Sequence, residues 1–91
     1  MRLDLFLKHS RLVVRRTVAQ QLCEAGAVKV NDAPAKSSRE VRVGDKISIK
    51  QRGKITTARI LQIPSKQISK VQATALYEIL GIENYDEDLF N

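Results

Sequence analysis

The sequence predicts an α+β fold in which two short N-terminal helices pack on a small antiparallel sheet, followed by a C-terminal helix and an acidic tail. Three observations predict it. Apolar residues recur at helical spacing in the first 25 residues, they alternate with polar residues between residues 28 and 60, and helical spacing returns after Ser69. The 91 residues are 43% hydrophobic, enough for one small core and no second domain.

Both N-terminal helices are predicted from apolar spacing. Residues 2–8 form the first, because Leu3, Phe6 and Leu7 follow i, i+3, i+4 spacing. The second runs from about Arg16 to Ala25 and ends at Gly26, a residue that favours the left-handed turn after a helix. The side chains expected to lie off the apolar face of the first helix are Arg2, Asp4 and Lys8. Those expected on the buried side of the second helix are Val18, Ala19, Leu22, Cys23 and Ala25. Leu12, Val13 and Val14 are expected to anchor the linker between the helices.

The middle of the chain is predicted to form strands joined by tight turns. Alternation marks strands at residues 28–30, 41–43 and 46–50, and residues 54–63 form another, which Pro64 ends. The intervening turns are predicted at residues 31–34, Gly44-Asp45 and Arg52-Gly53.

The last predicted element is a helix that begins at Ser69, a residue suited to cap it, and ends at Gly81. Its apolar face comprises Val71, Ala75, Leu76, Ile79 and Leu80. We therefore divide the chain into a sheet-containing N-terminal unit (1–63), a helix packed on it (64–81) and an acidic mobile tail (82–91).

Composition excludes several functional classes. A lone cysteine, Cys23, excludes a disulfide framework and a cysteine-rich zinc module, and with His9 it offers at most two metal ligands. No nucleotide-binding or nucleophile motif is present, so we expect no enzyme, no cofactor and no metal. No signal peptide or segment of about 20 apolar residues is visible, which favours a cytoplasmic protein without a membrane partner.

Charge is distributed unevenly along the chain. Residues 1–54 hold 13 basic and 5 acidic residues, a net charge of +8, whereas residues 55–91 hold 3 and 5, a net charge of −2. Several arginines gather where the second helix starts, and a helix N-terminus with arginines around it attracts phosphate. This favours a polyanionic partner. With four aromatic residues and no tryptophan, base stacking is not expected to dominate.

The N-terminal half resembles the S4 RNA-binding domain family over residues 1–50. The matching residues are Arg2-Leu3-Asp4, Phe6-Leu7, Ser10-Arg11-Leu12, Arg15-Arg16-Thr17, Ala19, Leu22, Gly26, Val28, Val30-Asn31, Lys36, Ser38, Val41, Gly44-Asp45 and Ile47. The resemblance implies the S4-like (alpha-L) fold. Within the family the chain is similar to the free-standing members that act in bacterial ribosome-associated quality control, and also to the heat-shock member.

The resemblance implies a role on the ribosome. Such members bind large-subunit rRNA and peptidyl-tRNA or tRNA on obstructed large subunits, and they assist an RqcH-like tailing factor that adds alanine to the stalled chain. We expect the same of this protein, as a monomer off the ribosome. The predicted RNA-binding residues are Arg2, Lys8, Arg11, Arg15, Arg16, Thr17, Lys29, Asn31, Lys36 and Ser38, and Asp4 is predicted to orient Arg2 or Arg16.

The start of the second helix departs from the family pattern at one residue, and one variant tests the predicted RNA contact. Many family members place Ser or Thr where Arg15 stands, as a helix cap, so either another group caps the helix or the helix starts one residue later. Arg16→Glu is expected to abolish cosedimentation with large subunits and to leave thermal stability nearly unchanged.

Other functions stay open from the sequence. Within the RNA-binding class they are a heat-shock-type factor that recycles large subunits and a ribosome-assembly factor. Outside it they are a basic module that docks on an acidic protein and a DNA-binding regulator, although no helix with base-reading side chains stands out.

Overall fold

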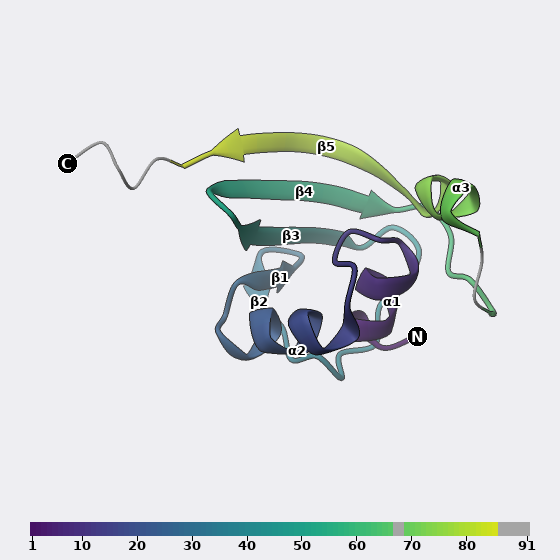
Figure 1. The fold of residues 1–91 in the computed structure, drawn as a ribbon, viewed down its shortest axis with the longest axis horizontal. Helices are drawn as coiled ribbons and strands as arrows, with labels where there is room; N and C mark the ends of the chain where they lie inside the picture. The colour runs from purple at the N-terminus through teal and green to yellow at the C-terminus, as the bar shows by residue number, and fades with distance from the viewer. Residues whose placement is uncertain (67–68, 86–91) are drawn as a thin grey trace.

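The computed structural model describes residues 1–66 and 69–85. It contains a five-stranded antiparallel sheet in the order β2-β1-β3-β4-β5, with helices α1 and α2 beside the β1–β3 part and β5 at the far edge (Figure 1). The elements are α1 (Leu3–His9), α2 (Arg16–Glu24), β1 (Val28–Val30), β2 (Ala33–Pro34), β3 (Lys46–Gln51), β4 (Lys54–Ile60), α3 (Lys70–Ala73), a 3-10 turn (Thr74–Leu76) and β5 (Tyr77–Asn84). The predicted α+β class and S4-like fold are confirmed.

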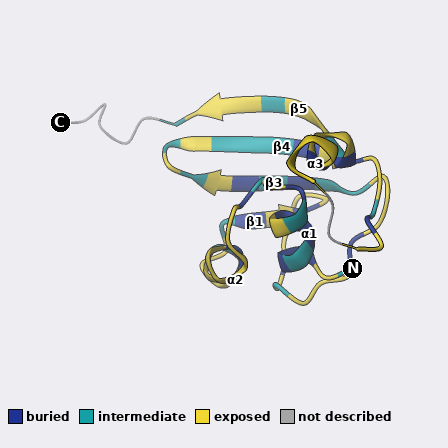
Figure 2. Cartoon of the chain, turned by 45° about the vertical axis from the view of Figure 1, so that its right-hand side comes forward, coloured by how far each residue is buried: buried dark blue, intermediate teal, exposed yellow. Residues whose placement is uncertain are grey.

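The core lies between α1, α2 and the adjacent strands (Figure 2). Leu3, Phe6 and Leu7 are fully buried, as their spacing predicts. They pack with alternate residues of the central strands, including Ile47 and Ile49. Burial of these side chains fixes α1 against the sheet, because each fully buried aliphatic or aromatic side chain contributes roughly 1.5 to 3 kcal/mol.

The ends of the two helices are held by different contacts. The backbone N–H groups of Leu3 and Asp4 donate to the carbonyls of Arg39 and Ser37, at 2.8 and 3.1 Å, so the loop after β2 closes over the start of α1. α2 ends as predicted at Gly26, whose φ of +76° allows paired hydrogen bonds back into the last turn of the helix.

The turn predictions are partly right. Arg52 and Gly53 both have positive φ, as a two-residue hairpin between β3 and β4 requires. Asn31 and Asp32 likewise turn the chain, but Ala33 and Pro34 pair with β1 as β2 rather than continuing the turn. The strand predicted at residues 41–43 is absent from the described sheet: Val41 is buried in a loop and Val43 is 62% exposed.

Several burial predictions are wrong. Asp4 was expected off the apolar face of α1, yet it is fully buried. Val14 and Val18 were expected inside, yet they are 67% and 36% exposed, and Ala25 is exposed as well. The buried residues of α2 are Ala19 and Cys23 alone, which form a narrow strip. Only this strip of the helix faces the core, so the other apolar residues of α2 stay partly or fully exposed.

The largest error concerns the C-terminal helix. Ser69 caps α3 in a capping box with Gln72, as predicted, but the helix lasts one turn and residues 77–84 form β5. Of the predicted apolar face only Leu76 is buried, whereas Val71 is 82% exposed, so a helix there would have had little to pack against. Pairing with β5 instead satisfies the open edge of β4 and gives the β5 backbone hydrogen-bond partners along one side.

The predicted acidic tail therefore starts inside a strand. Residues 82–84 belong to β5, and the remainder of the tail, residues 86–91, lies outside the described part of the chain. Within residues 1–66 and 69–85, no helix combines the length and the apolar character that crossing a bilayer requires.

Candidate nucleic-acid interface

A buried carboxylate lies at the centre of the basic N-terminal region. Asp4, in the first turn of α1, has no solvent exposure. Its Oδ1 accepts a hydrogen bond from the N–H of Leu5 at 2.9 Å. A buried charge of this kind is tolerated only when it is paired and hydrogen-bonded, so its partners determine what it does.

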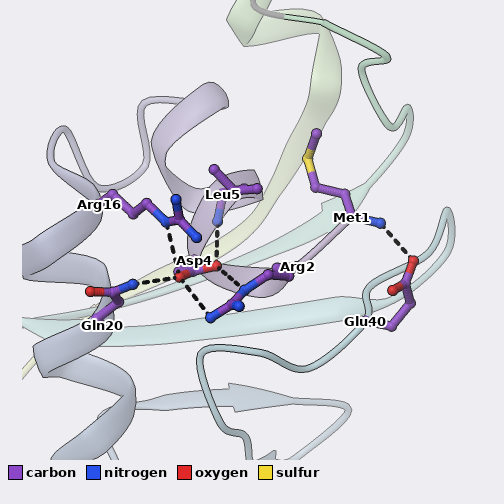
Figure 3. Close-up of polar contacts among 7 residues, drawn as sticks. All are labelled: Met1, Arg2, Asp4, Leu5, Arg16, Gln20 and Glu40. Carbon is purple, nitrogen blue, oxygen red and sulfur yellow. Dashed lines mark hydrogen bonds and ion pairs between the residues drawn. The ribbon is translucent and has the colours of Figure 1, made fainter.

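Those partners come from both helices and from the residue before α1 (Figure 3). Arg2 approaches Asp4 with Nε and one terminal nitrogen, at 3.2 and 3.4 Å. Arg16 donates from Nε to Oδ2 at 3.2 Å, and Gln20, one turn further along α2, donates to the same oxygen at 2.9 Å. We call Arg2, Asp4, Arg16 and Gln20 the Asp4 cluster.

The cluster keeps Asp4 ionised. Burial alone raises the pKa of Asp4, but the hydrogen bonds from Gln20, Arg16 and Arg2 outweigh that effect and hold the pKa below its ordinary value. The negative charge is thus permanent at neutral pH, and it lies between two positive groups that would otherwise repel each other.

Each of the two guanidinium groups contacts Asp4 through part of its nitrogens and exposes the rest to solvent. Arg2 and Arg16 keep 45% and 42% of their side-chain surface exposed. Arg16 uses Nε for Asp4, and its two terminal nitrogens have no hydrogen-bond partner among the described residues. A guanidinium oriented in this way presents its outer N–H groups in the fork geometry that matches two phosphate oxygens.

The start of α2 adds a second anion-attracting feature beside the cluster. The helix begins at Arg16, and Arg15 occupies the cap position with extended backbone angles and no side-chain cap bond. Of the two alternatives for the helix start, neither holds within the described residues: the helix begins at Arg16 and no side chain caps it. Its first N–H groups therefore have no capping partner there and carry the partial positive charge of the helix. Arg15 and Thr17 are both exposed there.

The other predicted residues lie in three places. Lys8 and Arg11 are exposed at the end of α1 and in the following turn. Lys36 and Ser38 line a groove that also contains Gln20, so the loop over α1 extends the basic surface next to the Asp4 cluster. Lys29 is exposed on β1, away from the helix start.

Asn31 has an internal role. Its Nδ2 donates to Asp45 at 3.1 Å and its Oδ1 accepts from the N–H of Lys46 at 3.0 Å, so the amide ties the β1–β2 turn to the start of β3.

Gln20 is the residue of the cluster that sequence reasoning missed. Its position four residues after Arg16 places both side chains on one face of α2, which is the signal that could have found it. The cluster also changes one expectation. Because Arg16 holds a buried carboxylate, Arg16→Glu would place a second negative charge beside Asp4, and unchanged thermal stability no longer follows.

Comparison with known proteins shows the family of the chain. A family model described as the S4 domain matches residues 1–47, which include both helices and every member of the Asp4 cluster. The chain belongs to the S4 domain family. The resemblance predicted from the sequence is thereby confirmed.

Similar proteins cover nearly the whole chain. The RQC P-site tRNA stabilizing factor of Listeria innocua is 45% identical over 87 residues, 96% of this chain and 94% of its own. The protein of the same name from Streptococcus pneumoniae is 36% identical, over 98% and 100%. These relatives confirm the similarity to the quality-control members of the family.

Two solved structures share the fold. Heat shock protein 15 of Vibrio cholerae, described as a trimer, has a TM-score of 0.81 at 30% identity and covers 87% of this chain and 80% of its own. The solution structure of the hypothetical protein HP1423 has a TM-score of 0.70 at 39% identity, over 97% and 100%.

Proposed function

We propose that the protein is a non-catalytic RNA-binding adaptor of ribosome-associated quality control in the cytoplasm. It binds large-subunit rRNA and tRNA on obstructed large subunits that carry peptidyl-tRNA, and off the ribosome it is a monomer. The observation that carries the proposal is the Asp4 cluster, in which a buried carboxylate holds Arg2 and Arg16 with their outer N–H groups exposed. Relatives named for stabilising P-site tRNA support the ribosomal setting.

The proposed mechanism is recognition of RNA shape and backbone. The major groove of A-form RNA is too deep and narrow for side chains to read, so contacts fall on phosphates and 2′-hydroxyls. Arg2 and Arg16 grip phosphate oxygens, and the exposed N–H groups at the start of α2 receive a further phosphate. Lys8, Arg11, Arg15 and the 36–38 loop extend the contact.

Holding the tRNA is how the protein assists alanine tailing. A rigid adaptor that contacts large-subunit rRNA and tRNA together lowers the rate at which the tRNA leaves the subunit. The peptidyl end then stays in place while an RqcH-like tailing factor delivers successive alanines. In this scheme the adaptor makes and breaks no covalent bond.

Cosedimentation with large subunits tests the proposal. Arg16→Gln removes the charge and the fork without adding a negative group, and we expect binding about 10- to 100-fold weaker, since a hydrogen bond to a charged group contributes roughly 1.5 to 3 kcal/mol. Arg59→Gln is the matched control. Arg59 lies on β4 between the buried residues Ala58 and Ile60, so its side chain points to the opposite face of the sheet.

The outcome depends on the difference between the two variants. If folded Arg16→Gln and Arg59→Gln cosediment equally well, the Asp4 cluster is not the RNA contact and the proposal is wrong. Subunits prepared with and without bound P-site tRNA add a second comparison, and the quality-control role requires tighter binding to those that carry tRNA.

A second candidate function rests on the structural similarity to heat shock protein 15. As a recycling factor of the heat-shock type, the protein would bind large subunits independently of any tailing factor. Crosslinking in stressed cells followed by sequencing of the attached RNA separates the two. Fragments of both large-subunit rRNA and tRNA favour quality control, and fragments of small-subunit RNA alone would exclude both.

A further inference from the structure

Two valines on the basic side of the molecule are exposed without an evident reason. Val14 precedes α2 and Val18 lies one turn further on, and they are 67% and 36% exposed. The sequence predicts Val14 as an apolar anchor of the linker and Val18 on the buried side of the second helix. Exposed apolar residues are ordinary when scattered, but these two lie together and line the same depression of the surface.

That depression is a groove between the start of α2 and the β3–β4 turn. Its volume is about 340 Å³, within the range of roughly 300 to 1,000 Å³ that small-ligand sites occupy. Its wall residues are Leu12, Val13, Val14, Arg15, Val18, Gln51 and Arg52. We call it the Val14 groove.

The charges around the Val14 groove have one sign. Arg15 on the helix side and Arg52 on the hairpin side are both exposed, and no acidic residue of the described part of the chain lines the groove. Neither arginine side chain has a hydrogen-bond or ion-pair partner in the part of the chain that the structure describes. The groove therefore suits an occupant with a flat or apolar part for the valines and negative charge for the arginines.

An RNA nucleotide has both parts. We propose that the Val14 groove receives one unstacked nucleotide of the bound RNA, with its base against Val14 and Val18 and its flanking phosphates on Arg15 and Arg52. This inference rests on the proposed function, because it extends the same RNA contact. Arg15 lines the groove and directly precedes Arg16 of the Asp4 cluster, so both include a residue at the start of α2 and one RNA segment can reach both.

The chemistry of the groove favours an unstacked base over duplex. Proteins read single-stranded loops and bulges by placing bases against apolar or aromatic side chains and guanidinium planes. The chain has only four aromatic residues, and none of those within residues 1–66 and 69–85 lines the groove, so valines and arginines take that part here. A regular duplex keeps its bases stacked inside and offers phosphates alone.

Four variants measured on two RNAs test the inference. The RNAs are an oligouridine single strand and a regular duplex of equal length. Val14→Thr keeps the shape of the side chain and makes it polar. Its control is Val43→Thr, because Val43 is 62% exposed in a loop and does not line the groove. Arg52→Asn removes one charge and suits the positive φ of +55° at that position, with Arg59→Gln as its control.

We expect Val14→Thr to weaken binding of the single strand roughly three- to tenfold, as partial loss of a valine contact should, and to leave duplex binding unchanged. Arg52→Asn should lower the slope of log affinity against log salt for the single strand by about 0.7. The two controls should match the wild type on both RNAs.

The failures of the two proposals are distinguishable. If Arg16→Gln weakens both RNAs but the groove variants behave like their controls, the groove inference is overturned and the proposed function stands. If Arg16→Gln changes neither RNA, the proposed function fails as well. If the groove variants leave RNA binding intact but weaken binding of an acidic, leucine-rich peptide, the groove belongs to a protein partner and the nucleotide assignment is wrong.

Discussion

Replacing Asp4 by Asn separates an orienting role from simple electrostatic attraction. The change keeps the size of the side chain and removes the charge that holds Arg2 and Arg16. It also raises the net charge of the protein from +6 to +7. If RNA were attracted by net charge alone, affinity would rise. We predict instead that it falls about tenfold, because both guanidinium groups lose their anchor and must be ordered again on binding.

The effect on stability follows from the environment of Asp4. The carboxylate is fully buried but its two arginine partners are nearly half exposed, so the interaction lies between a surface pair of about 0 to 1 kcal/mol and a broken buried pair of about 3 to 5 kcal/mol. We expect the free energy of unfolding to fall by roughly 2 kcal/mol at pH 7. Asp32→Asn is the control, because Asp32 is 79% exposed and its loss raises net charge equally.

The stability difference should depend on pH with a definite sign. Because the folded protein holds the pKa of Asp4 below its ordinary value of 3.8, the stabilisation is complete above that value and is lost as pH falls through the lower, folded value. Urea unfolding of wild type and Asp4→Asn from pH 7 down to about pH 2 should therefore show curves that converge in acid. Equal stability at pH 7, or tighter RNA binding by Asp4→Asn than by Asp32→Asn, would refute the orienting role.

Three further predictions concern the rest of the fold. Burial raises the pKa of Cys23 to about 11, with a smaller contribution from the negative charge of Asp4. Thiol labelling at pH 8 should therefore be slow in the native protein and fast in urea, and rapid native labelling would contradict the burial of Cys23. Gly53→Ala should destabilise the protein by about 1 kcal/mol in urea unfolding, because φ at that position is +75°, whereas Gly81→Ala, where φ is not positive, should cost less from backbone strain. Amide exchange over residues 77–84 should alternate between protected and fast positions, as for an edge strand paired on one side, and uniform protection would instead indicate the helix that the spacing suggested.

The sequence predicts best where local pattern and tertiary packing agree. Leu3, Phe6 and Leu7 form a narrow apolar stripe that can be buried only if α1 forms, and Gly26 and Gly53 mark turns that few other residues allow. These elements are decided within a few residues of chain. The S4 pattern then places Arg2 and Arg16 in one site, although they are 14 residues apart in sequence.

The predictions fail where the partner is distant in the chain. Residues 71–80 carry apolar side chains at spacings that fit a helix, and only the open edge of β4 selects the strand. Asp4 is polar by type, and its burial depends on Arg16 and Gln20, which α2 brings to it from 12 and 16 residues away. Exposure of Val14 has the same origin, since it depends on how far the β3–β4 turn lies from α2.

The Asp4 cluster gives the proposed RNA-binding face a reason to keep a buried acidic residue. A negative group near the proposed RNA contact reduces the long-range attraction for phosphate, so net charge alone would favour its loss. The carboxylate of Asp4 fixes the positions of two guanidinium groups that repel each other before RNA binds. The entropy lost in ordering these side chains is then lost on folding and does not weaken binding. Gln20 completes the arrangement as a neutral donor, because a third cation beside Asp4 would restore the repulsion that the carboxylate removes. On this view the affinity of the face depends on the geometry that one carboxylate imposes more than on the excess of basic residues.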